Sequence, residues 1–187
     1  MNRFAVRRLR LHCALFALLL FALSIPAARA QTALYGQFGA SRFYSVPKAN
    51  SSANINDWGY GGGFGLYSDF MKVPFGKVGG DIRVQFVRPA SNTTLTSFLL
   101  GPRLALHPKV VPLNPYAEFL FGGGHFSYGN NSPSTTQFDW RVLGGVDKTL
   151  LPHLDWRVIE VSYGQLNTYS GRLRPVTLST GIVLRLH

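Results

Sequence analysis

Residues 76–88 alternate between apolar and polar side chains. This period of two is that of a β-strand, whose successive side chains point to opposite faces of the sheet. One face collects Gly76, Val78, Gly80, Ile82, Val84 and Phe86. The other collects Lys77, Gly79, Asp81, Arg83, Gln85 and Val87. The pattern fits either a soluble sheet with its apolar face in a core or a membrane barrel with that face toward lipid.

Similar alternation recurs in eight segments of about ten to fifteen residues, separated by turn-forming residues. The segments are residues 32–45, 58–69, 76–88, 94–107, 116–128, 136–148, 154–167 and 174–187. No long stretch of residues 31–187 has helical periodicity, and glycines interrupt nearly every candidate helix. The sequence therefore predicts an all-β fold of eight strands.

Two properties of these strands favour a transmembrane barrel over a soluble sandwich. They are long, whereas strands of soluble sheets average about five or six residues, and their length suits a tilted crossing of a bilayer. Their polar faces also combine small residues with charges of both signs, which would fill the narrow interior of an eight-stranded barrel as compensated pairs. The predicted interior charge network is Lys77, Asp81, Arg83, Arg103, Glu118, Asp139, Arg141, Asp147, Glu160 and Arg185.

The opposite faces are predicted to contact lipid. Their residues are Phe64, Leu66, Val78, Ile82, Val84, Phe86, Leu104, Phe119, Phe121, Trp140, Val142, Ile159, Val161, Leu178, Ile182 and Leu184. An even number of strands with both ends in the periplasm predicts outer loops at 46–57, 89–93, 129–135 and 168–173, and inner turns at 70–75, 108–115 and 149–153. Aromatic residues near the strand ends are expected to form interfacial girdles: Tyr44, Trp58, Tyr60, Phe70, Phe75, Tyr128, Phe138 and Trp156.

Residues 1–30 have the pattern of a cleavable signal peptide, which leaves residues 31–187 as the barrel domain. Four arginines precede an apolar stretch at 13–25, and Ala28 and Ala30 supply the small residues of a cleavage site. The stretch is short for a transmembrane helix. Cleavage after Ala30 lowers the net charge from +11 to +6, because five arginines leave with the signal. The case for nucleic-acid binding weakens accordingly.

Residues 31–187 contain no cysteine, so neither disulfides nor thiolate metal sites are expected. The histidines are scattered without metal-ligand spacing, and the glycine runs lack the Lys-Ser/Thr of a phosphate loop. The sequence therefore predicts no metal and no cofactor.

The whole chain after residue 30 resembles the small outer-membrane β-barrel proteins of the OmpA-like transmembrane class. It is most similar to the compact barrel-only members of soil bacteria such as Acidobacteria. The motifs that carry the resemblance lie at 115–117, 122–124, 144–147, 156–160 with Tyr163, and 178–186. The resemblance implies an integral outer-membrane protein of the porin-like barrel type, folded by periplasmic chaperones and the barrel-assembly machinery and surrounded by outer-membrane lipid and lipopolysaccharide. Family members usually end on an aromatic residue, whereas this chain ends on Leu186 and His187.

The sequence offers three functional readings. The favoured one is a structural or surface-interaction role in the envelope without a catalytic site, the interior charges serving as a salt-bridge network. The second is a low-conductance pore lined by those charges. The third is a hydrolase: His125 and Ser127 share one strand face, as in some eight-stranded outer-membrane lipid A deacylases, and Asp139 on the next strand is the candidate carboxylate, although the alternation points it inward.

Overall fold

The computed structural model describes residues 31–47, 56–89, 93–106, 108, 112–128, 135–168 and 171–186. The chain divides into two units, Met1–Ala30 and Gln31–His187, and only the second contains described residues. The predicted signal peptide and its Ala28 and Ala30 therefore lie outside the described residues. No helix that could span a bilayer occurs in the described part of the chain.

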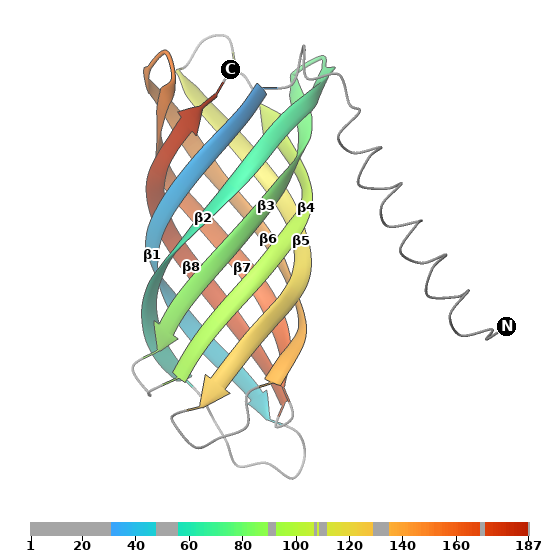
Figure 1. Ribbon diagram of the computed structural model, residues 1–187, viewed down its shortest axis with the longest axis vertical. Coiled ribbons are helices and arrows are strands. Elements are labelled where there is room, and N and C mark those ends of the chain that lie inside the picture. The colour runs from blue at the N-terminus through green and yellow to red at the C-terminus, as the bar shows by residue number, and fades with distance from the viewer. Residues whose placement is uncertain are drawn as a thin grey trace, which may run out of the picture. The chain divides into compact units, whose positions relative to one another are not determined.

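Eight antiparallel strands form a closed barrel (Figure 1). Each strand pairs with its neighbours in sequence, and β8 pairs with β1 to close the ring. The strands are β1 (Gln31–Pro47), β2 (Asn56–Val73), β3 (Gly76–Pro89), β4 (Thr93–Leu106), β5 (Leu113–Tyr128), β6 (Thr135–Leu151), β7 (Leu154–Thr168) and β8 (Gly171–Arg185). The predicted all-β, eight-stranded, up-and-down fold is confirmed.

The two ends of the barrel differ in the parts of the chain that they carry. At one end β1 begins and β8 ends, and the β2–β3 and β6–β7 turns lie beside them; we call this the terminal end (Figure 1). The other end carries the β1–β2, β3–β4, β5–β6 and β7–β8 connections, and we call it the loop end. Two backbone hydrogen bonds hold the end of the chain at the terminal end: Leu186 N donates to Thr32 O at 2.8 Å, and Arg185 N donates to His153 O at 2.9 Å.

At the terminal end, several strands extend further than the sequence predicted. The predicted turns 70–75 and 149–153 shrink to residues 74–75 and 152–153, because the flanking strands continue to pair. A β-bulge lies between Asp69 and Met71 and another between Thr149 and Leu151. A bulge absorbs one extra residue without ending the ladder, so a strict period of two does not carry across it.

The limits of β5 and β8 also differ from prediction. β5 begins at Leu113 rather than at residue 116, since Leu113 still pairs with Lys148. β8 begins at Gly171 rather than at residue 174, because its ladders with β1 and β7 both reach Gly171. It ends at Arg185, before Leu186, and His187 lies outside the described residues.

The inward face of the barrel is not uniformly polar. Near the loop end, inward-facing side chains from six strands form an apolar cluster, which we call the loop-end plug. Its members are Phe43, Val87, Leu95, Phe126, Leu166 and Leu173. All six side chains are at most 6% exposed. A second apolar cluster lines the β4–β5–β6 wall, formed by Leu99, Ala105, Tyr116, Leu120 and Leu143. The barrel is thus filled by layers, some apolar and some charged, as expected for an interior only as wide as its side chains.

Two inward-facing tyrosines fit only because glycine stands opposite them. Tyr35 pairs with Gly65 across β1 and β2, and Tyr116 pairs with Gly145 across β5 and β6. A Cβ on either glycine would overlap the hydroxyl and ring of its tyrosine as well as a backbone oxygen. Each glycine therefore leaves room for the hydroxyl end of a tyrosine ring at the inner wall.

We predict that Gly145→Ala lowers the free energy of unfolding by about 1–3 kcal/mol, because the added methyl overpacks the interior. The measurement is the urea midpoint of the folded gel band in detergent. The matched control is Gly36→Ala, whose outward Cβ meets no atom within 4 Å and should cost nothing. Equal midpoints for Gly145→Ala and the wild type would contradict the tyrosine packing.

Candidate functional site

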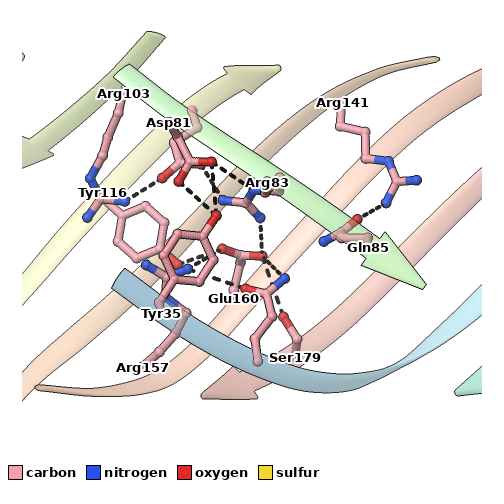
Figure 2. A network of polar contacts seen from close by, with 12 residues as sticks. Tyr35, Asp81, Arg83, Gln85, Arg103, Tyr116, Arg141, Arg157, Glu160 and Ser179 are labelled. Carbon is pink, nitrogen blue, oxygen red and sulfur yellow. Dashed lines mark hydrogen bonds and ion pairs between the residues drawn. The ribbon is translucent and has the colours of Figure 1, made fainter. Parts of the chain in front are cut away.

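A network of charged side chains fills the middle of the barrel, with Arg83 of β3 at its centre (Figure 2). Its Nε lies 3.2 Å from Asp81 Oδ1 and its Nη1 lies 2.9 Å from Glu160 Oε1. Its Nη2 contacts Glu118 of β5. Arg83 is 1% exposed, and one guanidinium thus links carboxylates from three strands across the interior.

Two further arginines extend the network toward the terminal end. Arg103 contacts Glu118, and its Nη2 lies 3.5 Å from Asp147 Oδ2. Arg157 Nε lies 3.0 Å from Asp147 Oδ1, and its Nη1 lies 3.2 Å from Glu160 Oε2. Arg103 Nε also lies 3.7 Å from Asp69 Oδ1. Because Glu118, Asp147 and Glu160 are each shared between two arginines, the pairs form one connected network.

The network holds more carboxylates than guanidiniums. Its acidic members are Asp69, Asp81, Glu118, Asp147 and Glu160, and its basic members are Arg83, Arg103 and Arg157. Neutral donors supply the remaining bonds: Tyr35 Oη donates to both Asp81 oxygens at 2.8 and 2.9 Å, and Tyr116 Oη donates to Glu160 Oε2 at 2.7 Å. Gln37 Nε2 donates to Glu160 Oε1 at 3.3 Å. These donors lower the cost of burying the excess negative charge.

Tyrosine rings cover the faces of the same guanidiniums. Arg103 Cζ lies 4.0 Å from the ring centre of Tyr67 and 4.1 Å from that of Tyr116. Arg157 Cζ lies 4.6 Å from Tyr116 and 4.3 Å from Tyr35. Each guanidinium therefore meets carboxylates at its edge and aromatic rings at its faces, which is the geometry of a desolvated cation–π contact.

A smaller polar cluster lies between the central network and the loop-end plug. Arg141 Nη2 lies 2.9 Å from Asp139 Oδ2 and donates to Ser97 Oγ at 2.9 Å. Ser97 Oγ donates to Asp139 Oδ2 at 2.7 Å. Arg141 Nη1 donates to Gln85 Oε1. Asp139 is fully buried and turned into the barrel.

Four of the predicted charges lie outside the central network: Asp139 and Arg141 form the smaller cluster, and Arg185 and Lys77 bind other residues. Arg185 pairs with Asp155 near the terminal end, where its side chain is 20% exposed. Lys77 donates to the side-chain oxygen of Gln31. The other predicted charges, from Asp81 to Glu160, are buried inside the barrel.

Sequence reasoning missed several interior residues, of which Arg157 is the clearest case. Counting by twos from Glu160 points residue 157 outward, yet both side chains are buried. The ladders show why: Arg157 pairs with Gly181 and Glu160 with Ser179, so a β-bulge places one extra residue between them. Other interior residues that the predicted charge network left out keep the inward parity of their segments: Tyr35, Gln37, Tyr67, Asp69 and Tyr116.

A small cavity lies inside the barrel. Its volume of about 10 Å³ is room for roughly one water molecule, and it lies against the wall formed by β1, β2, β3 and β8. Its polar lining consists of Gln37, Ser41, Gln85, Thr177 and Ser179. Beyond it the loop-end plug fills the interior.

The hydrolase candidates lie on two different sides of the barrel wall. His125 is exposed and shares the outward face of β5 with Ser127, and its Nδ1 lies 3.1 Å from Thr136 Oγ1 on β6. Asp139 lies on the inward face, bonded to Ser97 and Arg141. The carboxylate therefore cannot orient His125, because the sheet separates the two side chains.

The residues predicted to contact lipid all lie on the outward face. Most are exposed: Phe64, Leu66, Ile82, Phe86, Leu104, Phe119, Phe121, Val142, Ile159, Val161, Leu178, Ile182 and Leu184. Val78, Val84 and Trp140 are half-exposed on the same face. Trp140 packs between Phe119 and Tyr163, with ring centres 6.4 and 6.2 Å away. Among the described residues, no group of three or more His, Cys, Asp or Glu is placed to hold a metal ion.

No protein-family model matches this chain, and no curated protein sequence matches it. Solved structures do match. Neisserial surface protein A (NspA) superposes with a TM-score of 0.60 at 15% identity, over 82% of this chain and 99% of NspA. The outer membrane enzyme PagL superposes with a TM-score of 0.54 at 13% identity, over 80% of this chain and 97% of PagL. The chain has the fold of the small outer-membrane β-barrels.

This likeness supports the predicted resemblance at the level of fold. Another match, the attachment invasion locus protein Ail of Yersinia pestis, has a TM-score of 0.46 at 15% identity, over 83% of this chain and 99% of Ail. PagL is an enzyme by its description, so the shared barrel is compatible with catalysis as well as with non-catalytic roles.

We predict that Arg83→Met destabilises the barrel by about 3–5 kcal/mol, because it leaves Asp81, Glu118 and Glu160 buried with less compensation. The urea midpoint of the folded band in detergent measures the loss. Arg88→Gln is the control, since Arg88 is exposed on the outward face of the same strand and should shift the midpoint little. A midpoint unchanged by Arg83→Met would refute the role assigned to the network.

Proposed function

We propose that this chain is an integral protein of the bacterial outer membrane with a sealed barrel and a structural or surface-interaction role. One observation carries the proposal: large apolar side chains are exposed on every strand around the closed barrel. Soluble monomers rarely expose contiguous apolar surface beyond a few hundred Å². Such a belt is energetically favourable when lipid covers it.

Strand length and aromatic residues support the same placement. A strand of fourteen or more residues tilted by about 40° rises roughly 35 Å, enough to cross a hydrocarbon core of about 30 Å. Exposed aromatic side chains border the belt at both ends. Tyr44, Trp58, Tyr60 and Phe138 lie toward the loop end, and Phe70, Phe75 and Trp156 lie toward the terminal end. The loop end would then face outward and the terminal end the periplasm.

The filled interior supports a structural or interactive role over a pore. Ionised side chains pair across the middle of the barrel, and the loop-end plug of apolar residues covers them. An ion crossing this interior would have to break buried pairs, at several kcal/mol each. Outer-membrane lipid, lipopolysaccharide and, during biogenesis, periplasmic chaperones and the barrel-assembly machinery are the partners that this placement implies.

We predict that the full chain, expressed in a Gram-negative host, fractionates with the outer membrane and runs faster in a detergent gel before boiling than after. The shift arises because a closed barrel resists detergent until heated. Identical migration of boiled and unboiled samples, or recovery in the soluble fraction, would overturn the proposed placement. The same preparation in planar bilayers should give no discrete conductance steps; reproducible steps would favour the pore.

A hydrolase is the second candidate, favoured by the adjacency of His125 and Ser127 on one outward face. The missing element is a carboxylate beside His125. We predict that lipid A from cells expressing the protein keeps its acyl count in mass spectra. Loss of an acyl chain that Ser127→Ala abolishes, with Ser162→Ala on the inner wall as control, would instead establish the hydrolase.

A further inference from the structure

The outward face at the loop end carries a cluster of arginines and aromatic rings, which we call the arginine patch. It spans β8, β1, β2 and β3 and consists of Arg42, Tyr44, Trp58, Tyr60, Arg88, Arg172 and Arg174. Arg42 lies close to two aromatic rings of the patch: its Cζ lies 5.2 Å from the ring centre of Tyr44 and 5.4 Å from that of Trp58. Its Nε donates to Asn56 Oδ1 at 3.4 Å.

The strand register brings the patch together. Tyr44 of β1 stands opposite Arg174 of β8, so Arg42 and Arg174 are diagonal neighbours on one face. Arg42 stands opposite Trp58 of β2, and Tyr60, two residues further along β2, stands opposite Arg88 of β3. At about 4.8 Å per strand spacing, the patch is roughly 15 Å wide.

Among the described residues, no ion pair joins an arginine of the patch to a carboxylate. The chain has only eight Asp and Glu residues, and seven of them are buried in the barrel: Asp69, Asp81, Glu118, Asp139, Asp147, Asp155 and Glu160. The eighth, Asp57, stands opposite inward-facing Phe43. The buried Nε of Arg174 finds no hydrogen-bond partner among the described residues. The patch therefore presents unneutralised positive charge at the edge of the apolar belt.

The patch occupies one sector of the loop end. The outward positions of β4 to β7 at the same end carry uncharged polar side chains instead: Thr94, Thr96, His125, Ser127, Thr136, Gln165 and Asn167. A generic interfacial preference for basic residues would distribute them around the rim. The cluster on one sector fits an amphipathic ligand whose anionic headgroup contacts the arginines and whose apolar part contacts the adjoining apolar belt.

We propose that the arginine patch binds the phosphate groups of an outer-leaflet phosphorylated glycolipid of the lipopolysaccharide type. This inference rests on the proposed outer-membrane placement, in which the loop end meets the outer leaflet. Guanidinium forks bind phosphate oxygens in bidentate geometry. Trp58 and Tyr60 would pack against the sugar ring or upper acyl chain, and Phe38 and Leu178 of the apolar belt lie toward the membrane centre on β1 and β8.

The test compares Arg42→Gln/Arg174→Gln with Lys72→Gln/Lys148→Gln, which removes two exposed charges near the terminal end. Full-length chains are purified from the outer membrane in detergent and titrated with bis-phosphorylated lipid A, read by native mass spectrometry. We expect the arginine variant to bind about tenfold more weakly and the lysine variant to match the wild type. Lipid A stripped of phosphate should bind all three proteins equally.

Equal binding by the wild type and the arginine variant, or an equal loss in the lysine variant, would overturn the proposal. Displacement of lipid A by millimolar inorganic phosphate would overturn the assignment to a lipid headgroup. The gel shift on boiling checks that each variant folds, and Arg42→Lys/Arg174→Lys should regain part of the affinity. A wild-type protein that shows no heat shift, or that is not found in the outer membrane, would contradict the proposed placement. Equal lipid A binding by folded variants would contradict only the role of the arginine patch.

Discussion

The pairing of buried charges is the constraint on which the rest of this barrel depends. Closing eight strands leaves an interior that only side chains can fill, and this chain fills its middle with carboxylates and guanidiniums. Such groups are costly to bury unless every one has partners. Arg83, Arg103 and Arg157 meet that condition by sharing carboxylates from several strands. The bridges from Arg83 to Glu118 and to Glu160 link strands far apart in sequence, so the network and the closed ladder stabilise each other.

The burial of the acidic residues also determines the charge and polarity of the outward face. With seven carboxylates buried, the outward face is left with apolar side chains along the strands and cations near the ends. An apolar belt suits lipid, and unneutralised arginines suit phosphate. The interior network and the proposed contacts with the membrane are therefore two results of one distribution of charge.

The alternation of side chains between the two faces of the barrel wall also limits which residues can form a catalytic site. In a single-layer barrel, neighbouring side chains on adjacent strands cooperate only if they share a face. His125 and Ser127 share the outward face of β5, whereas Asp139 takes part in the interior cluster with Ser97 and Arg141. Asp139 has suitable chemistry, but the alternation of β6 turns its side chain inward, away from His125 and Ser127.

The sequence by itself determined the strand count, the antiparallel order and the sidedness of most residues, because a period of two is a local property that each strand carries alone. It also placed Arg83, Glu118 and Glu160 inside. Only the tertiary structure decided which charges meet, since partners on different strands depend on stagger around the closed ring. It alone revealed the bulge that turns Arg157 inward, the apolar plug at the loop end, and the gathering of Arg42, Arg88 and Arg174 on one sector. These features arise from register and closure, which no single strand encodes.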